Sequence, residues 1–325
     1  MAVIASGSVA FDYIMTFDGR FGDHIMPDRK HMINLSFLVE RFEKRRGGVA
    51  ANYAYTLALL GYPGAVLATA GEDAAGYRDW LAELGVDVSG LRLLDGWTSA
   101  TGFNTTDLDG NQIWGYYGGA MLEAAQLGLD DTEARPEALI VGPNAPAAMF
   151  RLVDEARERN LPWVFDPAHQ LPHLSADDLE RGARGAWILI GNDYETQLVQ
   201  ERTGRDLKGL LELAEVVVTT MGKDGSQIDA REGSHRIPAA APREVVDPTG
   251  AGDAYRAGLV ASRLLGLGWE EAGRVASLAS TYVVEQRGTI DHSYTLPEFA
   301  ERYRQAFGSE LPAALTAAPS ADARA

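Results

Sequence analysis

Residues 247–258 read Asp-Pro-Thr-Gly-Ala-Gly-Asp-Ala-Tyr-Arg-Ala-Gly and carry the strongest chemical signal in the chain. Gly250, Ala251 and Gly252 form a turn of small residues directly before an apolar segment, residues 254–265, which we expect to be helical. Such a turn leaves backbone N–H groups unpaired at the positive end of the helix dipole, which makes a cradle for an anion. The sequence therefore predicts an anion site at this turn.

A carboxylate, Asp253, follows the cradle at once. A negative charge beside an anion site is unfavourable unless it has a task. The economical task is that of a general base, which takes a proton from an attacking hydroxyl while the N–H groups stabilise a phosphoryl group. The alternative is that Asp253 is a first-turn acid that merely suits the helix dipole. The turn alone favours this alternative, and the motifs described below favour the base.

Two further groups of polar residues follow expected elements. Asp12 comes soon after an apolar strand, residues 3–6, and a carboxylate there can accept two vicinal hydroxyls. Gly47 and Gly48 open a helix, which close approach of the backbone to a ligand would explain. Asn52, one turn into that helix, can donate and accept hydrogen bonds at a polyol. A glycine pair at the start of a helix and an aspartate after a strand are also common where no ligand binds.

Strand-like apolar runs alternate with helix-like segments over most of the chain. Near-continuous apolar strands with helical crossovers indicate a parallel sheet covered on both faces, and ligands of such sheets bind at the carboxyl ends of the strands. The expected strands are residues 3–6, 65–70, 138–141, 163–166, 187–190 and 216–219, and the expected helices are residues 49–60, 77–84, 145–159, 176–183 and 193–201.

Residues 13–46 and 100–117 break this alternation. The second segment reads as a hairpin of residues 100–106 and 112–117, because Asp109-Gly110-Asn111 is a turn signal. Both segments can combine into a small sheet that serves as a lid over a cleft, although a β-insertion without a role is the alternative. This division assigns residues 1–12, 47–99 and 118–310 to an α/β core. We expect residues 311–325, rich in Ala, Ser and Pro, to be a disordered tail.

The composition is that of an ordinary globular protein of 325 residues, with 46% hydrophobic residues. With 46 acidic and 29 basic residues, the net charge of −17 argues against a nucleic acid or an anionic membrane as partner. The chain has no cysteine, so disulfides and thiolate chemistry are excluded. The first residues do not resemble a secretory signal and no apolar run is long enough to span a bilayer, so we expect a cytoplasmic protein.

Taken together, these motifs resemble the ribokinase-like (PfkB) family of carbohydrate and nucleoside kinases, over residues 2–305. Both signature regions of that family are present in the right order. Asn192-Asp193-Tyr194-Glu195 is similar to its Asn-x-x-Glu motif, and residues 220–225 are similar to its Thr-x-Gly-x-x-Gly motif. The resemblance implies that Asn192 and Glu195 organise Mg²⁺ and phosphate, largely through water. It also implies that three residues lie along ATP: Thr220, Gly222 and Gly225.

The resemblance implies a fold and a reaction. The fold is a ribokinase-like three-layer α/β/α sandwich with a mainly parallel central sheet and a small β-sheet lid. In the reaction, Asp253 deprotonates a primary hydroxyl of the acceptor, and the N–H groups of Gly250, Ala251 and Gly252 hold the γ-phosphoryl of ATP. Family members often use K⁺ near this anion hole, and Asp247 is the candidate ligand. Arg46 either reaches the phosphates or is a solvated charge at the edge of the lid.

Within the family, the chain resembles bacterial adenosine kinases of the actinobacterial type. The likeness lies in residues 21–52, including Asn34–Val39, and in residues 116–121 and 166–170. It implies phosphorylation of adenosine to AMP, as in purine salvage. A departure is His173, where such enzymes lead us to expect an arginine near the phosphates.

The resemblance also assigns contacts to the acceptor. Phe103 and Tyr117 are expected to stack on the base, with packing or dimer contacts as the alternative, and Gln170 is expected to hydrogen-bond the base edge. Met121 counts among the predicted substrate contacts. The ribose would be bound by Ser8, Asp12, Gly48 and Asn52.

The resemblance further implies a homodimer joined through the lid sheets, with Ser36 or Phe37 of one subunit near the pocket of the other. An exposed, partly apolar sheet needs a cover, which is a physical reason for pairing. Two other functions stay open: a sugar kinase acting on ribose or fructose, and a non-catalytic member that binds a ligand. A dinucleotide-binding protein is disfavoured, since no Gly-x-Gly-x-x-Gly follows the first strand.

Overall fold

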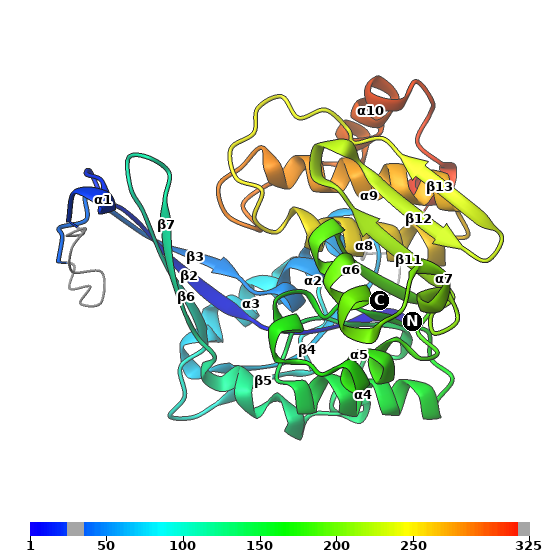
Figure 1. The fold of residues 1–325 in the computed structure, drawn as a ribbon, viewed down its shortest axis with the longest axis horizontal. Helices are drawn as coiled ribbons and strands as arrows, with labels where there is room; N and C mark the ends of the chain where they lie inside the picture. Colours follow the sequence, from blue (N-terminus) through cyan, green and yellow to red (C-terminus); the bar gives the residue numbers. More distant parts are fainter. Residues whose placement is uncertain (25–35, 318–325) are drawn as a thin grey trace.

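The computed structural model describes residues 1–24 and 36–317, and within them it forms two β-sheets and the helices that cover the larger sheet (Figure 1). The larger sheet contains β1 (Ala2–Ser6), β4 (Gly64–Gly71), β5 (Leu91–Leu94), β8 (Pro136–Val141), β9 (Trp163–Phe165), β10 (Ile188–Asn192), β11 (Val216–Thr220), β12 (Ser226–Ala230) and β13 (Gly233–Ile237). The smaller sheet contains β2 (Ala10–Thr16), β3 (Arg41–Gly47), β6 (Ala100–Thr106) and β7 (Gln112–Tyr117).

The α-helices are α1 (Phe21–His24), α2 (Val49–Leu59), α3 (Ala75–Glu83), α4 (Pro146–Glu158), α5 (Ala176–Ala183), α6 (Asp193–Thr203), α7 (Leu207–Leu211), α8 (Ala251–Leu264), α9 (Trp269–Val284), α10 (Leu296–Phe307) and α11 (Ala313–Thr316). Short 3₁₀ helices are η2 (Glu72–Ala74), η3 (Gly119–Gln126), η4 (Leu129–Asp131), η5 (Ala168–His173) and η6 (Gly222–Asp224).

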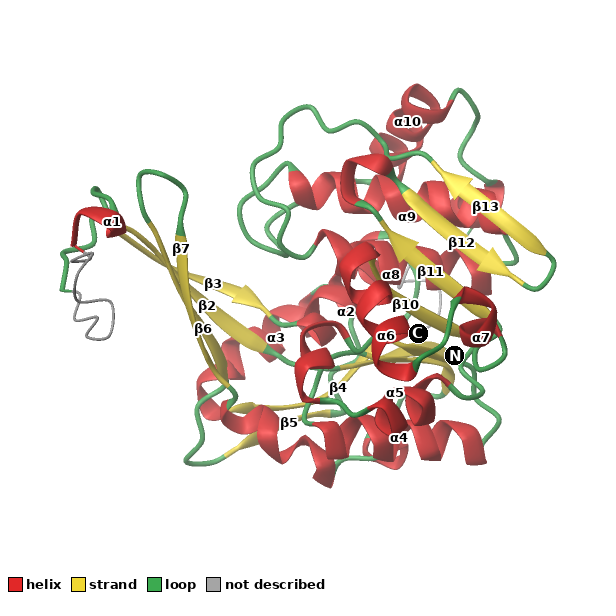
Figure 2. Cartoon of the chain, in the orientation of Figure 1, coloured by secondary structure: helices red, strands yellow, loops and turns green. Residues whose placement is uncertain are grey.

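The larger sheet has the order β13-β12-β11-β10-β9-β8-β1-β4-β5, and its neighbouring strands pair in parallel except that β12 is antiparallel to both β11 and β13. Side chains alternate between its faces, so Val3 and Ala5 of β1 enter one hydrophobic core while Ala2 and Ile4 enter the other. Helices α2, α8 and α9 supply the first core, and α4, α5 and α6 supply the second (Figure 2). The predicted three-layer α/β/α sandwich with a mainly parallel sheet is confirmed.

The smaller sheet projects from one side of this body (Figure 2) and has the order β3-β2-β6-β7. It contains the predicted hairpin of β6 and β7, and β2 pairs with β6 in parallel and with β3 in antiparallel orientation. Arg45 ties β3 to the segment between α9 and α10. Its Nη1 donates to the carbonyl of Arg287 at 2.8 Å and forms an ion pair with Asp291. The use of this sheet as a lid stays a prediction.

The C-terminal segment corrects one expectation. Residues 311–317, which we expected to be disordered, pack on the core through Leu311 and Leu315, with 6% and 0% of their surface exposed. Two leucines in an Ala-rich segment are enough to hold a short helix in place. Residues 318–325 of the predicted tail, and Asn34 and Leu35 of the Asn34–Val39 segment, lie outside the described residues.

Over residues 1–24 and 36–317, no helix is long and apolar enough to cross a membrane.

Candidate active site

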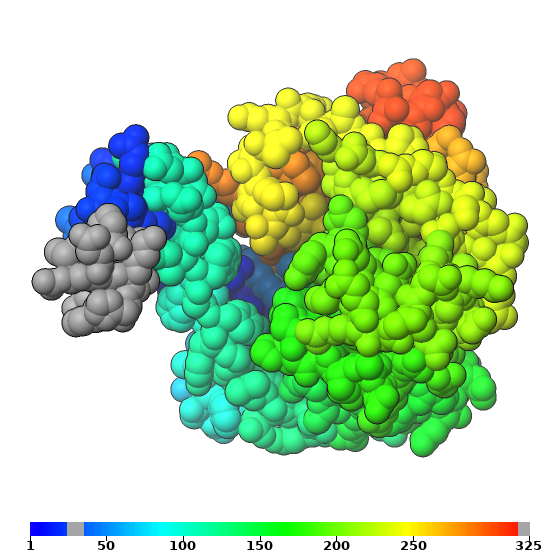
Figure 3. Space-filling model, in the orientation of Figure 1, coloured from blue at the N-terminus to red at the C-terminus, as the bar shows by residue number. Residues whose placement is uncertain are grey.

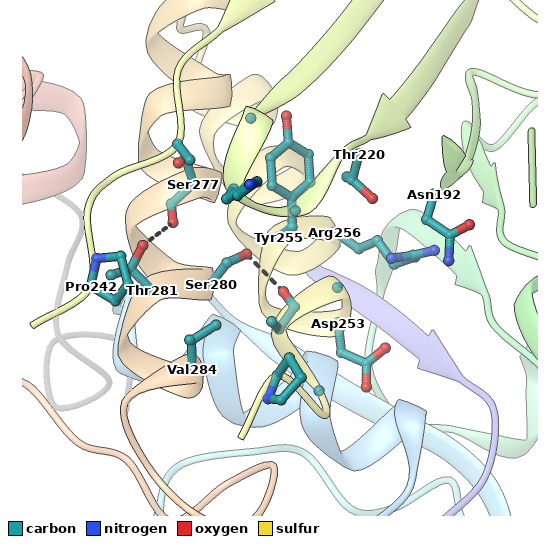
Figure 4. A pocket seen from close by; sticks show the side chains of 18 of the residues that line it. Asn192, Thr220, Pro242, Asp253, Tyr255, Arg256, Ser277, Ser280, Thr281 and Val284 are labelled. Carbon is teal, nitrogen blue, oxygen red and sulfur yellow. Dashed lines mark hydrogen bonds between the residues drawn. The ribbon is translucent and has the colours of Figure 1, made fainter. Parts of the chain in front are cut away.

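A cavity of about 750 Å³ lies between the N-terminus of α8, the ends of β10 and β11, and one face of α9 (Figure 4). It brings together every residue predicted for catalysis and every residue predicted for the nucleotide. These are Asn192, Glu195, Thr220, Gly222, Gly225, Gly250, Ala251, Gly252 and Asp253. Residues from three separate segments of the sequence therefore meet in one cavity, at the carboxyl edge where parallel sheets bind ligands.

The turn before α8 has the geometry of an anion cradle. Gly250 is the N-cap and has φ +83°, and a Cβ there would lie 2.7 Å from the Cβ of Thr289, so two separate constraints require glycine. The N–H groups of Gly250 and Gly252 donate to no partner among the described residues. The N–H of Ala251, also predicted to bind the anion, instead donates to the carbonyl of Pro248 at 3.2 Å. Two of the three predicted donors are thus free.

Asp253, in the first turn of α8, is held by a polar chain from two other segments. Nδ2 of Asn52 donates to its Oδ2 at 2.6 Å, and Oγ1 of Thr289 donates to Oδ1 of Asn52 at 2.8 Å. Burial raises the pKa of Asp253 to about 7, against the lowering effects of Arg256 and of the hydrogen bond from Asn52. A carboxyl with a pKa near neutrality is suited to exchange a proton with a hydroxyl.

Asp12 lies in β2 with its carboxylate wedged between two glycines. A Cβ at Gly47 or at Gly102 would lie 2.5 Å from a carboxylate oxygen of Asp12. No described residue hydrogen-bonds this carboxylate. Burial and the charge of Asp247 raise the pKa of Asp12 to about 6. A half-buried carboxylate without a protein donor is left available for the hydroxyls of a ligand.

Ser8 and Gly48 lie at the junction of the sheets, beside Asp12. Gly48 has φ +97°, and a Cβ there would lie 2.5 Å from the carbonyl oxygen of Ser8, so glycine is required for packing alone. The hydroxyl of Ser8 accepts from the N–H of Val49 at 3.2 Å. Both contacts fix the start of α2, the helix that carries Asn52.

The register of the smaller sheet shows which side chains share a face with Asp12. Asp12, Gly102 and Tyr116 are paired in register and therefore share one face. Phe103 and Tyr117 belong to the opposite face, where Phe103 stacks on Tyr13 with ring centroids 5.3 Å apart. A shift of one position moves a side chain to the other face of a strand, so Phe103 and Tyr117 face away from Asp12.

Trp114 and Tyr116 are the aromatic residues that share the face of Asp12. A Cβ at Gly102 would lie 3.2 Å from the Trp114 ring, and burial followed by the charge of Asp12 raises the pKa of Tyr116. The hydroxyl of Tyr116 points to the sulfur of Met121 at 3.5 Å, so the predicted Met121 lies against this face. If the alternation of side chains had been counted from Asp12 across the paired strands, it would have predicted that the rings of Trp114 and Tyr116 share its face. Figure 3 shows the recess between this sheet and the main body.

On the nucleotide side, Asn192 and Glu195 form a capping box at the start of α6. The Asn192 side chain accepts from the N–H of Glu195, and the Glu195 carboxylate accepts from the N–H of Asn192, both at 2.8 Å. The motif therefore has a structural role as well as a place in the cavity. Gly222 and Gly225 have φ values of +53° and +84° and turn the chain after Thr220.

Sequence reasoning missed the opposite wall of the cavity. It is formed by one face of α9, with Ser277, Ser280, Thr281 and Val284. Ser280 Oγ donates to the carbonyl of Ala251 at 2.7 Å and so braces the anion turn (Figure 4). The helical spacing of small residues on this face was the available signal.

Arg256 was also missed as a site residue. It lines the cavity, is 5% exposed, and forms an ion pair with the buried Asp166 at the end of β9. Asp166 also accepts a hydrogen bond from the hydroxyl of Tyr53 at 2.6 Å. The contact joins residues 90 positions apart, so no local sequence pattern could have predicted it.

The remaining predicted residues lie outside the lining of the cavity. Asp247 accepts from the N–H groups of Thr249 at 3.0 Å and Gly288 at 3.4 Å. Gln170 lies half-buried in η5, and Ser36 is exposed. Arg46 lies over the ring of Trp80, 4.7 Å from its centroid. The roles predicted for these residues stay predictions.

Within the described part of the chain, no three His, Cys, Asp or Glu side chains are grouped so that they could hold a metal ion.

A mainly parallel sheet between layers of helices, with a cavity and the Gly250–Asp253 turn at its carboxyl edge, defines an α/β protein of the ribokinase-like fold. The sequence pattern of the pfkB family carbohydrate kinases matches residues 12–296, and the chain belongs to this family.

Similar proteins carry a more specific name. The nucleoside kinase of Methanothermobacter thermautotrophicus is 33% identical over 95% of this chain and 98% of that protein. The structure of Burkholderia thailandensis nucleoside kinase in complex with inosine has a TM-score of 0.86 and 37% identity, and covers 95% of this chain and 99% of that one. The Methanocaldococcus jannaschii nucleoside kinase, an archaeal member of the ribokinase family, has a TM-score of 0.85 and 26% identity, with 94% and 98% covered.

Proposed function

We propose that this protein is an ATP- and Mg²⁺-dependent nucleoside kinase that phosphorylates the primary 5′-hydroxyl, with adenosine to AMP as the leading reaction. One observation carries the proposal: the Asp253 carboxylate follows directly on the free N–H groups of Gly250 and Gly252 in one cavity. The similar nucleoside kinases support the acceptor class, since one of them was solved with ADP and inosine.

The chain's own groups have defined roles in the proposed in-line transfer. The hydroxyl oxygen of the acceptor attacks the γ-phosphorus, and its proton passes to Asp253. The bond between the γ-phosphorus and the bridging oxygen breaks, and ADP leaves with the electron pair. Gly250 and Gly252 donate to the oxygens of the transferring group, so the site contributes positioning and charge stabilisation.

Mg²⁺ fits the oxygen donors near the phosphates. Magnesium usually keeps several waters and takes one or two carboxylates together with substrate phosphates. Glu195 and the amide oxygen of Asn192 are such donors in the cavity lining. When bound, the ion would neutralise phosphate charge, and Glu195 and Asn192 would hold its water shell.

The acceptor is proposed to lie between the small sheet and the anion turn, with the sheet closing over it as a lid. Asp12 would accept from the ribose hydroxyls, and Ser8, Gly48 and Asn52 border the same space. Trp114 and Tyr116, on the face of Asp12, would flank the base in place of Phe103 and Tyr117. A pair of rings suits a planar purine better than a free sugar, which supports adenosine over ribose or fructose.

Two further proposals concern the assembly and a monovalent ion. The exposed aromatic face of the small sheet, including Phe42 and Phe103, supports a homodimer through this sheet, with Ser36 near the partner's pocket. Asp247 is our candidate ligand for K⁺. Sedimentation and the dependence of turnover on K⁺ concentration test these two proposals separately.

An ADP-release assay tests the proposed function directly. Wild-type protein is given ATP and Mg²⁺ with adenosine, inosine, guanosine, cytidine, ribose and fructose in turn. We expect turnover with adenosine and little with the free sugars. Turnover with free sugars alone would replace the nucleoside proposal by the sugar-kinase alternative, and no turnover with any acceptor would favour a non-catalytic member.

Asp253→Asn is the matched variant for the base, because the amide keeps the shape and can still accept from Asn52. We expect turnover to fall by about 10²–10⁴-fold while ADP binding is retained. Near-normal turnover of this variant would remove Asp253 from the mechanism.

A further inference from the structure

Arg256 lies one helical turn after Asp253 on α8, and its guanidinium is held by Asp166, with Oε2 of Glu195 3.8 Å from Nη2. Nη2 donates to Oδ1 of Asp166 at 2.7 Å, and Nε approaches Oδ2 of Asp166 at 2.5 Å. Asp166 is 1% exposed and is itself fixed by Tyr53. The ion pair therefore fixes the position of the guanidinium rather than leaving a long side chain to sample rotamers.

The other edge of the guanidinium faces the anion turn. A Cβ at Gly252 would lie 2.7 Å from Nη1 of Arg256, so this nitrogen occupies the space that a side chain at 252 would fill. Gly252 has an ordinary helical φ, which leaves the guanidinium as the reason for glycine at this position. Among the described residues, none accepts a hydrogen bond from Nη1. A nine-tenths buried arginine thus presents an unused donor edge to the cavity (Figure 4).

The charges around this edge explain what it would bind. Three carboxyl groups lie around Arg256: those of Asp166, Glu195 and Asp253. The positive charge of Arg256 is paired most closely with Asp166. Nη1 is not among the fully buried polar atoms that lack a partner, so it is open to the cavity and can donate to a ligand there. An anion on the free N–H groups of Gly250 and Gly252 would lie against Gly252, within reach of Nη1. A planar guanidinium is suited to bridge a carboxylate on one edge and a phosphoryl oxygen on the other.

We propose that Arg256 is a catalytic residue, whose Nη1 donates to an oxygen of the transferring phosphoryl group, and that Asp166 is the residue that positions it. This proposal rests on the proposed function. Arg256 keeps its proton throughout and stabilises the charge on the phosphoryl oxygens while the hydroxyl proton passes to Asp253. It supplies the positive charge that we expected at His173, which is exposed and does not line the cavity.

Kinetics of Arg256→Lys and Arg256→Ala test this proposal. Loss of one donor to the transferring group lowers kcat by about 10²–10³-fold. We expect a loss of this size in both variants, with the KM of the nucleoside little changed, because Asp12 and the rings lie elsewhere. Added guanidinium ion should restore part of the turnover of Arg256→Ala.

Arg302 offers a matched control. It is 7% exposed and its Nη1 donates to Oε2 of Glu285 at 2.8 Å, but it does not line the cavity. Arg302→Ala should lose stability without a specific loss of kcat, and guanidinium should not act on it.

A double variant separates catalysis from folding. Arg256→Gln with Asp166→Asn removes both charges of the ion pair and keeps neutral hydrogen bonding between the two positions. Because Arg256 also lowers the pKa of Asp253, turnover is compared on the high-pH plateau, where Asp253 is ionised in both proteins. If the pair is only structural, this variant regains turnover near that of wild type, which overturns the proposal. If Arg256 is catalytic, the variant folds and stays slow. A wild-type protein without kinase activity contradicts the proposed function instead, so the two failures are distinguishable.

Discussion

The side-chain amide of Asn52 lies 2.6 Å from Oδ2 of Asp253, although the two residues are 201 positions apart. Thr289 fixes the amide by donating to its other end, so the NH₂ group, rather than the carbonyl, faces the carboxylate. An N–H donor at this place favours the ionised form of Asp253 and opposes the effect of burial. The geometry leads to the predictions below.

The pH dependence of turnover should follow Asp253. Burial raises its pKa to about 7, and a base must be ionised to accept a proton. The value of kcat/KM should therefore rise by about tenfold per pH unit below pH 7 and level off above it. Initial rates between pH 5 and 9 at saturating ATP measure this. A profile that is flat across pH 6–8 would contradict the assignment.

Asn52→Ala should move this limb to higher pH. The hydrogen bond from Asn52 lowers the pKa of Asp253, so its removal leaves burial less opposed. The expected sign is a loss of activity that is largest below pH 7 and smaller above pH 8. Thr289→Val, which keeps the shape and removes the hydroxyl, should act in the same direction with a smaller effect. An equal loss at every pH would mean that Asn52 acts on the acceptor alone.

The rings of the small sheet should differ in their effect on the nucleoside. Tyr116→Ala should raise the KM of the nucleoside by roughly 5–100-fold, since stacking on a base contributes about 1–3 kcal/mol. Phe103→Ala is the matched control, because Phe103 lies on the opposite face and stacks on Tyr13. Its KM should not change. The reverse pattern would show that the base reaches the other face of the sheet.

The end of the chain should contribute to stability. Leu315 is fully buried, so Leu315→Ala should lower the free energy of unfolding by about 2 kcal/mol, at the low end for a buried leucine. Urea denaturation followed by circular dichroism measures the change. Thr316→Ala, at an exposed neighbour, should change it by less than about 0.5 kcal/mol. Equal stabilities of both variants and wild type would mean that this segment does not pack in solution.

The sequence predicted the central sheet well because buried parallel strands have continuous apolar runs. β8, β9, β10 and β11 lie within a few residues of their expected positions. The hairpin of β6 and β7 was predicted with its bounds, since Asp109-Gly110-Asn111 marks the turn. The phase of the hairpin was not predicted, because aromatic residues occur on both faces at Tyr116 and Tyr117.

The site was predictable where its parts are contiguous in sequence. The turn at Gly250–Asp253 and the motifs at Asn192 and Thr220 could be read as short patterns, and the structure brings them together. The ion pair of Arg256 with Asp166 and the bond of Thr289 to Asn52 depend on tertiary contacts between distant segments, for which one sequence carries no local signal. The prediction of disorder after residue 310 was wrong for residues 311–317, because it followed the overall composition and gave too little weight to Leu311 and Leu315.

The segment between α9 and α10 contacts both the proposed base and the small sheet. Thr289 orients the amide that faces Asp253, while Arg287 and Asp291 hold Arg45 of the small sheet. We expect a swing of that sheet to pull on this segment and so to alter the alignment of Asp253. Such a mechanical linkage would let the base reach its working geometry only with an acceptor enclosed, which would guard the nucleotide against wasteful hydrolysis by water.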